Sequence, residues 1–180
     1  MKKKLSFKIA LGGLVSALSI ICMFFTGVMP LLSYALSALA GTFLIVIVIE
    51  LGKKWAFITY AAVSILSYFM TPDKEAAVLF TMLLGYYPIV KSFLEKIKFR
   101  PLEYLSKLAL FNVSIILSYQ IIIRLFGMTK LLDEFKEFGK YSIPVFLIAA
   151  NIAFILYDIA LTGVISTYIN TFRPKIMKRL

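Results

Sequence analysis

The sequence has no histidine and only one cysteine, Cys22, among its 180 residues. The lack of histidine excludes the commonest general base, metal ligand and proton relay of proteins. A single cysteine excludes a disulfide framework and a cysteine metal cage. The chain also carries no P-loop, no nucleophile triad and no pair of carboxylates at a plausible depth. These absences argue against an enzyme and against a resident metal or cofactor.

Charged residues are scarce as well. They make up 16% of the chain, whereas hydrophobic residues make up 61% and the mean hydropathy is +0.92. Soluble proteins are about 45–50% apolar, so this composition is typical of a polytopic membrane protein. We therefore expect a multi-pass protein of the cell membrane, and the length suits a single domain over residues 1–180.

Long apolar segments predict the membrane-spanning helices, because about 20 such residues in a helix cross the bilayer hydrocarbon. Six segments meet this description or come close to it: 9–25, 31–49, 55–70, 76–90, 108–123 and 141–169. The predicted fold is an all-α bundle of six transmembrane helices. A basic start can mark a signal peptide, but more membrane segments follow here, so we expect the first helix to be retained.

Two connecting segments and the fourth helix have sequence patterns that predict local structure. Residues 91–107 are basic with apolar side chains on one side, which predicts a connector lying in the membrane interface. Residues 130–140 mix apolar and charged side chains and predict a short amphipathic helix. Pro88, in the run 85–88, should kink or end the fourth helix. Such a break either shapes a substrate site, as in transporters, or serves packing alone.

The basic residues indicate the orientation. The chain has 20 Lys and Arg against 9 Asp and Glu, and fifteen of the 20 fall in the N-terminal stretch, the second and fourth loops and the C-terminal tail. The positive-inside rule then predicts that both termini are cytoplasmic, which requires an even number of helices. We attribute the net charge of +11 to orientation and to contact with anionic lipid rather than to nucleic-acid binding.

Asp158 is the one acidic residue inside the last apolar segment. A carboxylate in mid-membrane costs at least about 2.5–3.5 kcal/mol, so it should face protein or water. It is either a functional carboxylate or a packing residue that bonds Asn112 or a tyrosine hydroxyl.

Polar residues toward the outer side predict a ligand pocket. Gln120 and Arg124 are four residues apart on one face of the fifth helix, and Asn151 lies in the outer half of the sixth. Together with Tyr34 and Tyr119 they could line an outward-open pocket for a small molecule with an anionic group, since arginine pairs well with carboxylate or phosphate. The other interpretation is that Arg124 only reaches the outer headgroups.

Gly13 and Ala17 lie four residues apart on the first helix, beside other small residues. Small residues at this spacing let another helix approach closely, either in a partner protein or within the same bundle.

These features resemble the substrate-binding (S) component of the bacterial energy-coupling-factor vitamin transporters. The resemblance is architectural and covers the whole chain: its size, six helices with both ends inside, the small-residue first helix and an amphipathic outer loop before the last helix. It implies that Gly13 and Ala17 dock on a transmembrane coupling subunit driven by two ATPases, although the family usually has alanine at the first place. It also implies a vitamin site in the outer half, where Gln120, Arg124 and Asn151 would fall.

The expected function is therefore a membrane-embedded binding subunit for uptake of a small vitamin-like molecule, energised by separate subunits. The alternative is a non-transport accessory or scaffold subunit of a membrane complex.

Overall fold

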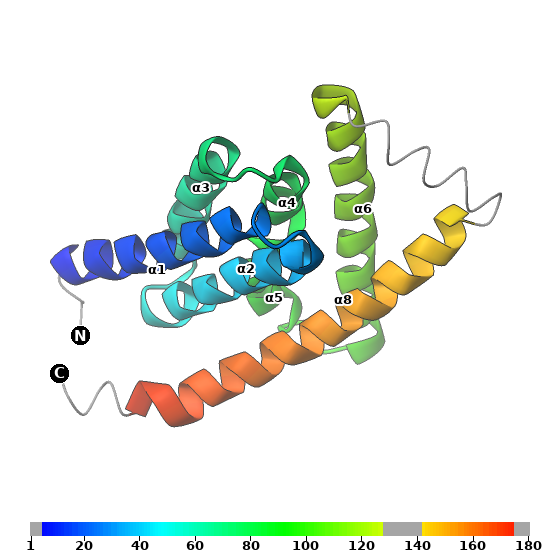
Figure 1. Cartoon of the computed structure of the whole chain (residues 1–180). Coiled ribbons are helices and arrows are strands. Elements are labelled where there is room, and N and C mark those ends of the chain that lie inside the picture. The colour runs from blue at the N-terminus through cyan, green and yellow to red at the C-terminus, as the bar shows by residue number, and fades with distance from the viewer. Residues whose placement is uncertain (1–4, 128–141, 175–180) are drawn as a thin grey trace.

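The structure is a computed structural model, and it describes residues 5–127 and 142–174. These residues form helices joined by short turns, with no strand among them, which confirms the all-α prediction (Figure 1). The elements are α1 (Leu5–Thr26), η1 (Pro30–Leu32), α2 (Ser33–Glu50), α3 (Lys53–Met70), α4 (Lys74–Leu79), η2 (Phe80–Leu84), α5 (Tyr87–Leu94), α6 (Arg100–Phe126), α8 (Ser142–Thr167) and η3 (Tyr168–Phe172). The expected amphipathic helix over 130–140 lies outside the described residues.

Several helices are long and apolar enough to cross a membrane. The five spans are Leu5–Thr26, Pro30–Glu50, Lys74–Leu94, Arg100–Phe126 and Pro144–Phe172. The predicted third helix also forms, as the 18-residue helix α3, but it is not among the five. A membrane protein is the class that these helices indicate.

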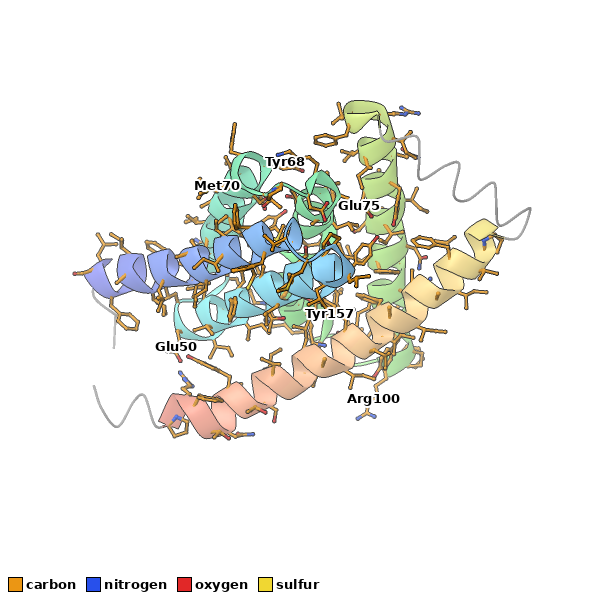
Figure 2. The ribbon with its side chains drawn as sticks, in the orientation of Figure 1. Glu50, Tyr68, Met70, Glu75, Arg100 and Tyr157 are labelled. Carbon is orange, nitrogen blue, oxygen red and sulfur yellow. The ribbon has the colours of Figure 1, made fainter. Side chains whose placement is uncertain are left out.

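Four helix ends gather at one end of the molecule. Near the start of α1, the Lys8 ammonium lies 5.6 Å from the ring centre of Trp55, at the start of α3. Arg173, which follows η3, donates to Glu50 at the end of α2 over 3.1 Å. Figure 2 shows Glu50 beside the C-terminal part of the last helix. The start of α1 and the end of α8–η3 thus lie on the same side of the bundle.

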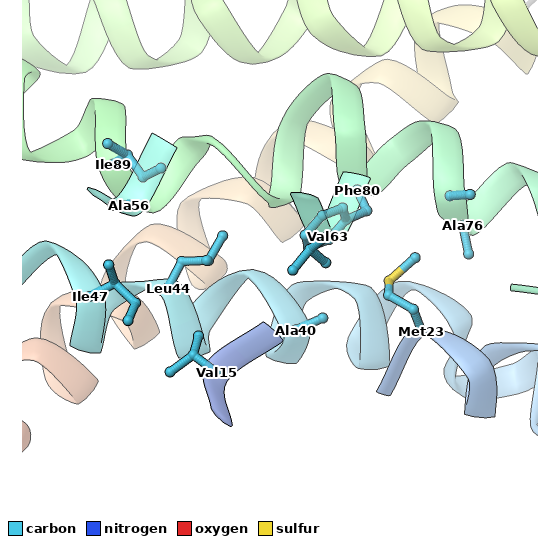
Figure 3. Packing of buried hydrophobic residues seen from close by; sticks show 11 residues of the cluster. Val15, Met23, Ala40, Leu44, Ile47, Ala56, Val63, Ala76, Phe80 and Ile89 are labelled. Carbon is cyan, nitrogen blue, oxygen red and sulfur yellow. The ribbon is translucent and has the colours of Figure 1, made fainter. Parts of the chain in front are cut away.

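Two apolar clusters hold the helices together. The first joins α1, α2 and α3 to the broken helix α4–η2–α5 and is shown in Figure 3; it contains Val15, Met23, Ala40, Leu44, Ile47, Ala56, Val63, Ala76, Ala77, Phe80 and Ile89. The second ties α2, α4, η2 and α5 to α6 and α8; it contains Ile45, Leu79, Leu83, Tyr87, Phe111, Ile115, Phe154 and Leu161. The candidate site lies beside this second cluster.

The fourth span is interrupted, as the sequence predicted. Helix α4 passes into the π-helical turn η2, and α5 begins at Tyr87 with Pro88 in its first turn. A proline suits the first turn, where its missing N–H leaves no hydrogen bond unmade. Single π turns are often found at functional sites.

The prediction that residues 91–107 form a connector in the membrane interface was wrong. Lys91 belongs to α5 and is fully buried, while α6 begins at Arg100, eight residues before the predicted start, and includes Lys107. The helices extend this far because both lysines find acidic partners inside the protein, which removes the cost that lone charges would impose.

Candidate functional site

A cavity of about 380 Å³ lies between α2, the interrupted span, α6 and α8. The described residues that line it are almost wholly apolar: Tyr34, Ala35, Ala38, Leu79, Leu83, Leu84, Phe111, Ile115, Tyr119, Phe146, Ala150, Ala153, Phe154 and Tyr157. This size falls within the roughly 300–1,000 Å³ of ligand pockets. The alanines leave the space, and the aromatic side chains form the walls.

The aromatic wall is well ordered by its own contacts. Phe111 and Phe154 stack with ring centres 4.5 Å apart, and Tyr87 packs edge-on against Phe154 at 4.9 Å. Near the other end, Tyr119 meets Phe146 edge-on at 5.5 Å. Such arrangements are favourable for aromatic rings and fix their planes, so the wall keeps its shape in the absence of a ligand.

The π turn places one wall of the cavity against α2. A Cβ atom at Gly41 would lie 2.0 Å from the carbonyl oxygen of Leu84, so only glycine permits this approach. Tyr157 reaches from α8 toward α2 (Figure 2) and its hydroxyl donates to the same Leu84 oxygen over 3.5 Å. The Gly85 N–H donates to Phe80 O at 2.7 Å and closes the turn. Contacts from α2 and α8 therefore fix Leu84, which belongs to the π turn and lines the cavity.

A polar group borders the cavity beside the start of α2. The Tyr34 hydroxyl donates to Glu75 Oε1 on α4 over 2.7 Å. Tyr119 of α6 interacts with both Tyr34 and Glu75. We call Tyr34, Glu75 and Tyr119 the rim group. It joins three helices at one edge of an otherwise apolar space.

The structure separates the predicted pocket residues into two sets. Tyr34 and Tyr119 line the cavity, whereas Gln120, Arg124 and Asn151 do not. Gln120 and Arg124 are exposed on the outer face of α6. They follow Tyr119 in the sequence, but the helical turn points them elsewhere.

Asn151 follows the cavity residue Ala150 and bonds Asn112 instead of a cavity-facing group. The two amides exchange hydrogen bonds of 2.9 and 3.1 Å between α6 and α8, and each also donates to the carbonyl four residues before it. The predicted bond between Asn112 and Asp158 was therefore wrong, because the amide of Asn112 pairs with Asn151, about two helical turns before Asp158 on α8.

Asp158 lies at the centre of a buried ion cluster. Its carboxylate accepts hydrogen bonds from the Tyr87 hydroxyl at 2.6 Å, from Lys91 Nζ, and from Lys107 Nζ at 3.1 Å. The tyrosine contact is the one that the sequence allowed, and the two lysines were not foreseen. Glu95 and Glu103 complete the group, which we call the ion cluster: Glu95 lies 3.0 Å from Lys91, and Glu103 lies 2.7 Å from Lys107.

The ion cluster joins α5, α6 and α8 next to the aromatic wall of the cavity. Lys91 is 0% exposed, Lys107 3% and Asp158 7%, so these charges are shielded from water. Tyr87 links this cluster to the cavity wall, because it bonds Asp158 and packs on Phe154. The spacings of four between Tyr87 and Lys91 and between Glu103 and Lys107 were the available sequence signal, since such pairs share one helix face.

Gly13 and Ala17 both lie on the exposed face of α1. A Cβ atom at Gly13 would meet nothing within 4 Å. The small-residue pair is therefore not used in packing between the helices that the structure describes.

No family model, curated protein or solved structure matches this chain.

Proposed function

We propose that this protein is the substrate-binding subunit of a membrane uptake system, with the architecture of an energy-coupling-factor S component. The observation that carries the proposal is the aromatic-walled cavity of about 380 Å³ among α2, η2, α6 and α8. A preformed apolar space with a few polar groups at its edge is the usual form of a small-molecule site. The interrupted span that forms one of its walls also supports transport.

We propose that this chain binds the substrate and that other subunits supply the energy for uptake. The chain carries no ATP-binding motif, so we propose that a transmembrane coupling subunit and ATPases supply the energy. The bound molecule would be small and vitamin-like.

The proposed orientation has both termini in the cytoplasm and the cavity in the outer half of the bilayer. Its support is the excess of basic residues in the N-terminal stretch, the second and fourth loops and the C-terminal tail. Among the described residues, Lys8 near the start of α1 and Arg173 after η3 lie at the same end of the bundle. A cytoplasmic reporter fused after Leu180 should be active, and an exterior-only reporter should be silent. Activity of the exterior reporter would reject this orientation.

A substitution that fills the cavity with a large side chain would test the binding function. Ala150→Trp places an indole inside the lining, whereas Ala149→Trp adds the same side chain at an exposed neighbour on α8. Wild-type protein and Ala149→Trp should retain a small molecule in native mass spectrometry after purification in detergent. Ala150→Trp should lose it and keep its melting temperature within a few degrees.

Two outcomes would contradict the proposed binding function. One is that no small molecule accompanies the wild type. The other is that only phospholipid is found, in equal amounts in all three proteins, which would make the cavity a crevice for lipid chains.

The proposed partner contact uses the exposed small residues of α1. Gly13→Leu combined with Ala17→Leu should leave the melting temperature nearly unchanged, because neither side chain points into the bundle. The same pair should reduce recovery of a coupling subunit after mild solubilisation by several-fold, since bulk at these positions holds a second helix away. Leu14→Ala, on the same exposed side, serves as a control. Full recovery with the double substitution would refute docking at this site.

The alternative function, an accessory or scaffold subunit, also finds support in this exposed face of α1. It predicts a stable protein complex with no retained small molecule. The cavity-filling experiment therefore separates the two functions, because only the transport function depends on Ala150.

A further inference from the structure

The residues that line the cavity favour one chemical class of ligand over others. Among the described residues, no Lys, Arg, Asp or Glu lines the cavity, and the side-chain polar atoms that these residues contribute are the hydroxyls of Tyr34, Tyr119 and Tyr157. A ligand must therefore place most of its surface against carbon, and its polar atoms must meet these hydroxyls or the adjoining carboxylate.

The polar groups bordering the cavity are disposed to accept hydrogen bonds. The Tyr34 hydroxyl already donates its proton to Glu75, and the Tyr157 hydroxyl donates to the Leu84 carbonyl. A hydroxyl that donates in this way still presents lone pairs, and an ionised carboxylate has only acceptor atoms. A ligand group beside them gains most if it carries an N–H or O–H donor.

The nearby cations are committed elsewhere. Lys91 and Lys107 point into the ion cluster, where Asp158 and two glutamates hold them on the far side of Tyr87 and Phe154 from the cavity. Arg124 is exposed and does not line the cavity. Among the described residues, no basic side chain is therefore placed to neutralise an anionic ligand in the cavity.

The walls favour a flat ring system and tolerate a positive charge. Six of the fourteen described residues that line the cavity are aromatic. Their faces attract both other rings and cations, and the attraction for a cation grows when water is excluded. An anion would face both the negative ring faces and Glu75.

We propose that the ligand of this cavity is a compact aromatic amine: a planar apolar body lying among Phe111, Phe154 and Tyr157, with an amino or ammonium group donating to the rim group. This inference rests on the proposed binding function and replaces the anionic ligand that Arg124 suggested in the sequence. Glu75 selects the charge and the aromatic wall selects the shape.

Three probes that share one ring test this proposal. Tryptamine carries an ammonium group, indole-3-ethanol a neutral hydroxyl and indole-3-acetate a carboxylate. In detergent, tryptamine should raise the melting temperature most, the alcohol less and the acid not at all. We expect tryptamine to bind more than about tenfold tighter than the acid, because the Glu75 carboxylate attracts the ammonium group and repels the carboxylate. Glu75→Gln should remove the preference for the amine over the alcohol, whereas Ala150→Trp should abolish binding of every probe.

The outcomes separate this inference from the proposed function. Stabilisation by indole-3-acetate equal to that by tryptamine, or an amine preference that survives Glu75→Gln, would overturn the aromatic-amine proposal alone. If no probe binds, the molecule retained by the wild type decides: a carboxylate or phosphate compound overturns the proposal, and an aromatic amine supports it. If no probe binds and no small molecule is retained, both this inference and the binding function fail.

Discussion

Replacing Lys91 with methionine is expected to lower the free energy of unfolding by about 3–5 kcal/mol, the usual cost of removing one partner from a buried ion pair. Methionine matches the length of the lysine stem, so packing changes little and the lost charge dominates. Lys91 is fully buried, and its ammonium group bonds the Asp158 carboxylate, the Asp158 carbonyl oxygen and Glu95. Without Lys91, three carboxylates remain around Lys107 alone. The measurement is reversible unfolding in mixed detergent micelles.

The charge balance of the ion cluster also predicts the order of the related variants. Asp158→Asn should cost less, about 1.5–3 kcal/mol, because Glu95 and Glu103 still neutralise the two lysines. Lys91→Met combined with Asp158→Leu should be more stable than Lys91→Met alone, since it removes an anion together with the cation. Lys98→Met, at an exposed lysine nearby, should have little effect. If Asp158→Asn costs more than Lys91→Met, the ion cluster is not held together by this charge balance.

Gly41→Ala is expected to cost about 1–3 kcal/mol, the range for overpacking a close contact. The added methyl group would lie 2.0 Å from Leu84 O, and this neighbour is backbone that cannot rotate away. Either α2 or the π turn must move, and Leu84 lines the cavity. We therefore expect both a lower melting temperature and weaker retention of the bound molecule.

Gly163→Ala is the matched control for this substitution. Gly163 also lies inside a long helix, but nothing stands within 4 Å of an added Cβ atom. Alanine is the better helix former, so Gly163→Ala should leave stability unchanged or raise it slightly. Equal losses at Gly41 and Gly163 would mean that helix propensity, and not the contact with the π turn, governs the effect.

The helices were predictable because a membrane simplifies the problem. Every backbone polar group in lipid needs an internal partner, so an apolar segment of sufficient length has to form a helix. The six predicted helical segments form, and the fourth is interrupted just before Pro88, which lies in the first turn of α5, where its missing N–H leaves no hydrogen bond unmade. The error at Lys91 and Lys107 arose because charge was taken to end a membrane segment. That rule fails when an acidic residue on another helix forms an ion pair with the lysine, as Asp158 does here.

The candidate site was predictable only in part. Tyr34 and Tyr119 were expected in a pocket and line the cavity, whereas Arg124 and Gln120 face outward. Sequence spacing shows which residues share a helix face but not which way that face points, because the rotation of a helix depends on its neighbours. Asn151 has the amide of Asn112 as its partner for the same reason: that pairing depends on where α6 and α8 cross.

The sequence by itself determined the membrane class, the all-α architecture and the break before Pro88, because composition, segment length and proline stereochemistry act locally. Only the tertiary structure decided what Asp158, Lys91 and Lys107 do and where the cavity lies. These features depend on contacts between α2, α5, α6 and α8, which are far apart in the chain. Burial makes each such charge costly without its partners, so the roles of these residues follow from the packing that brings them together.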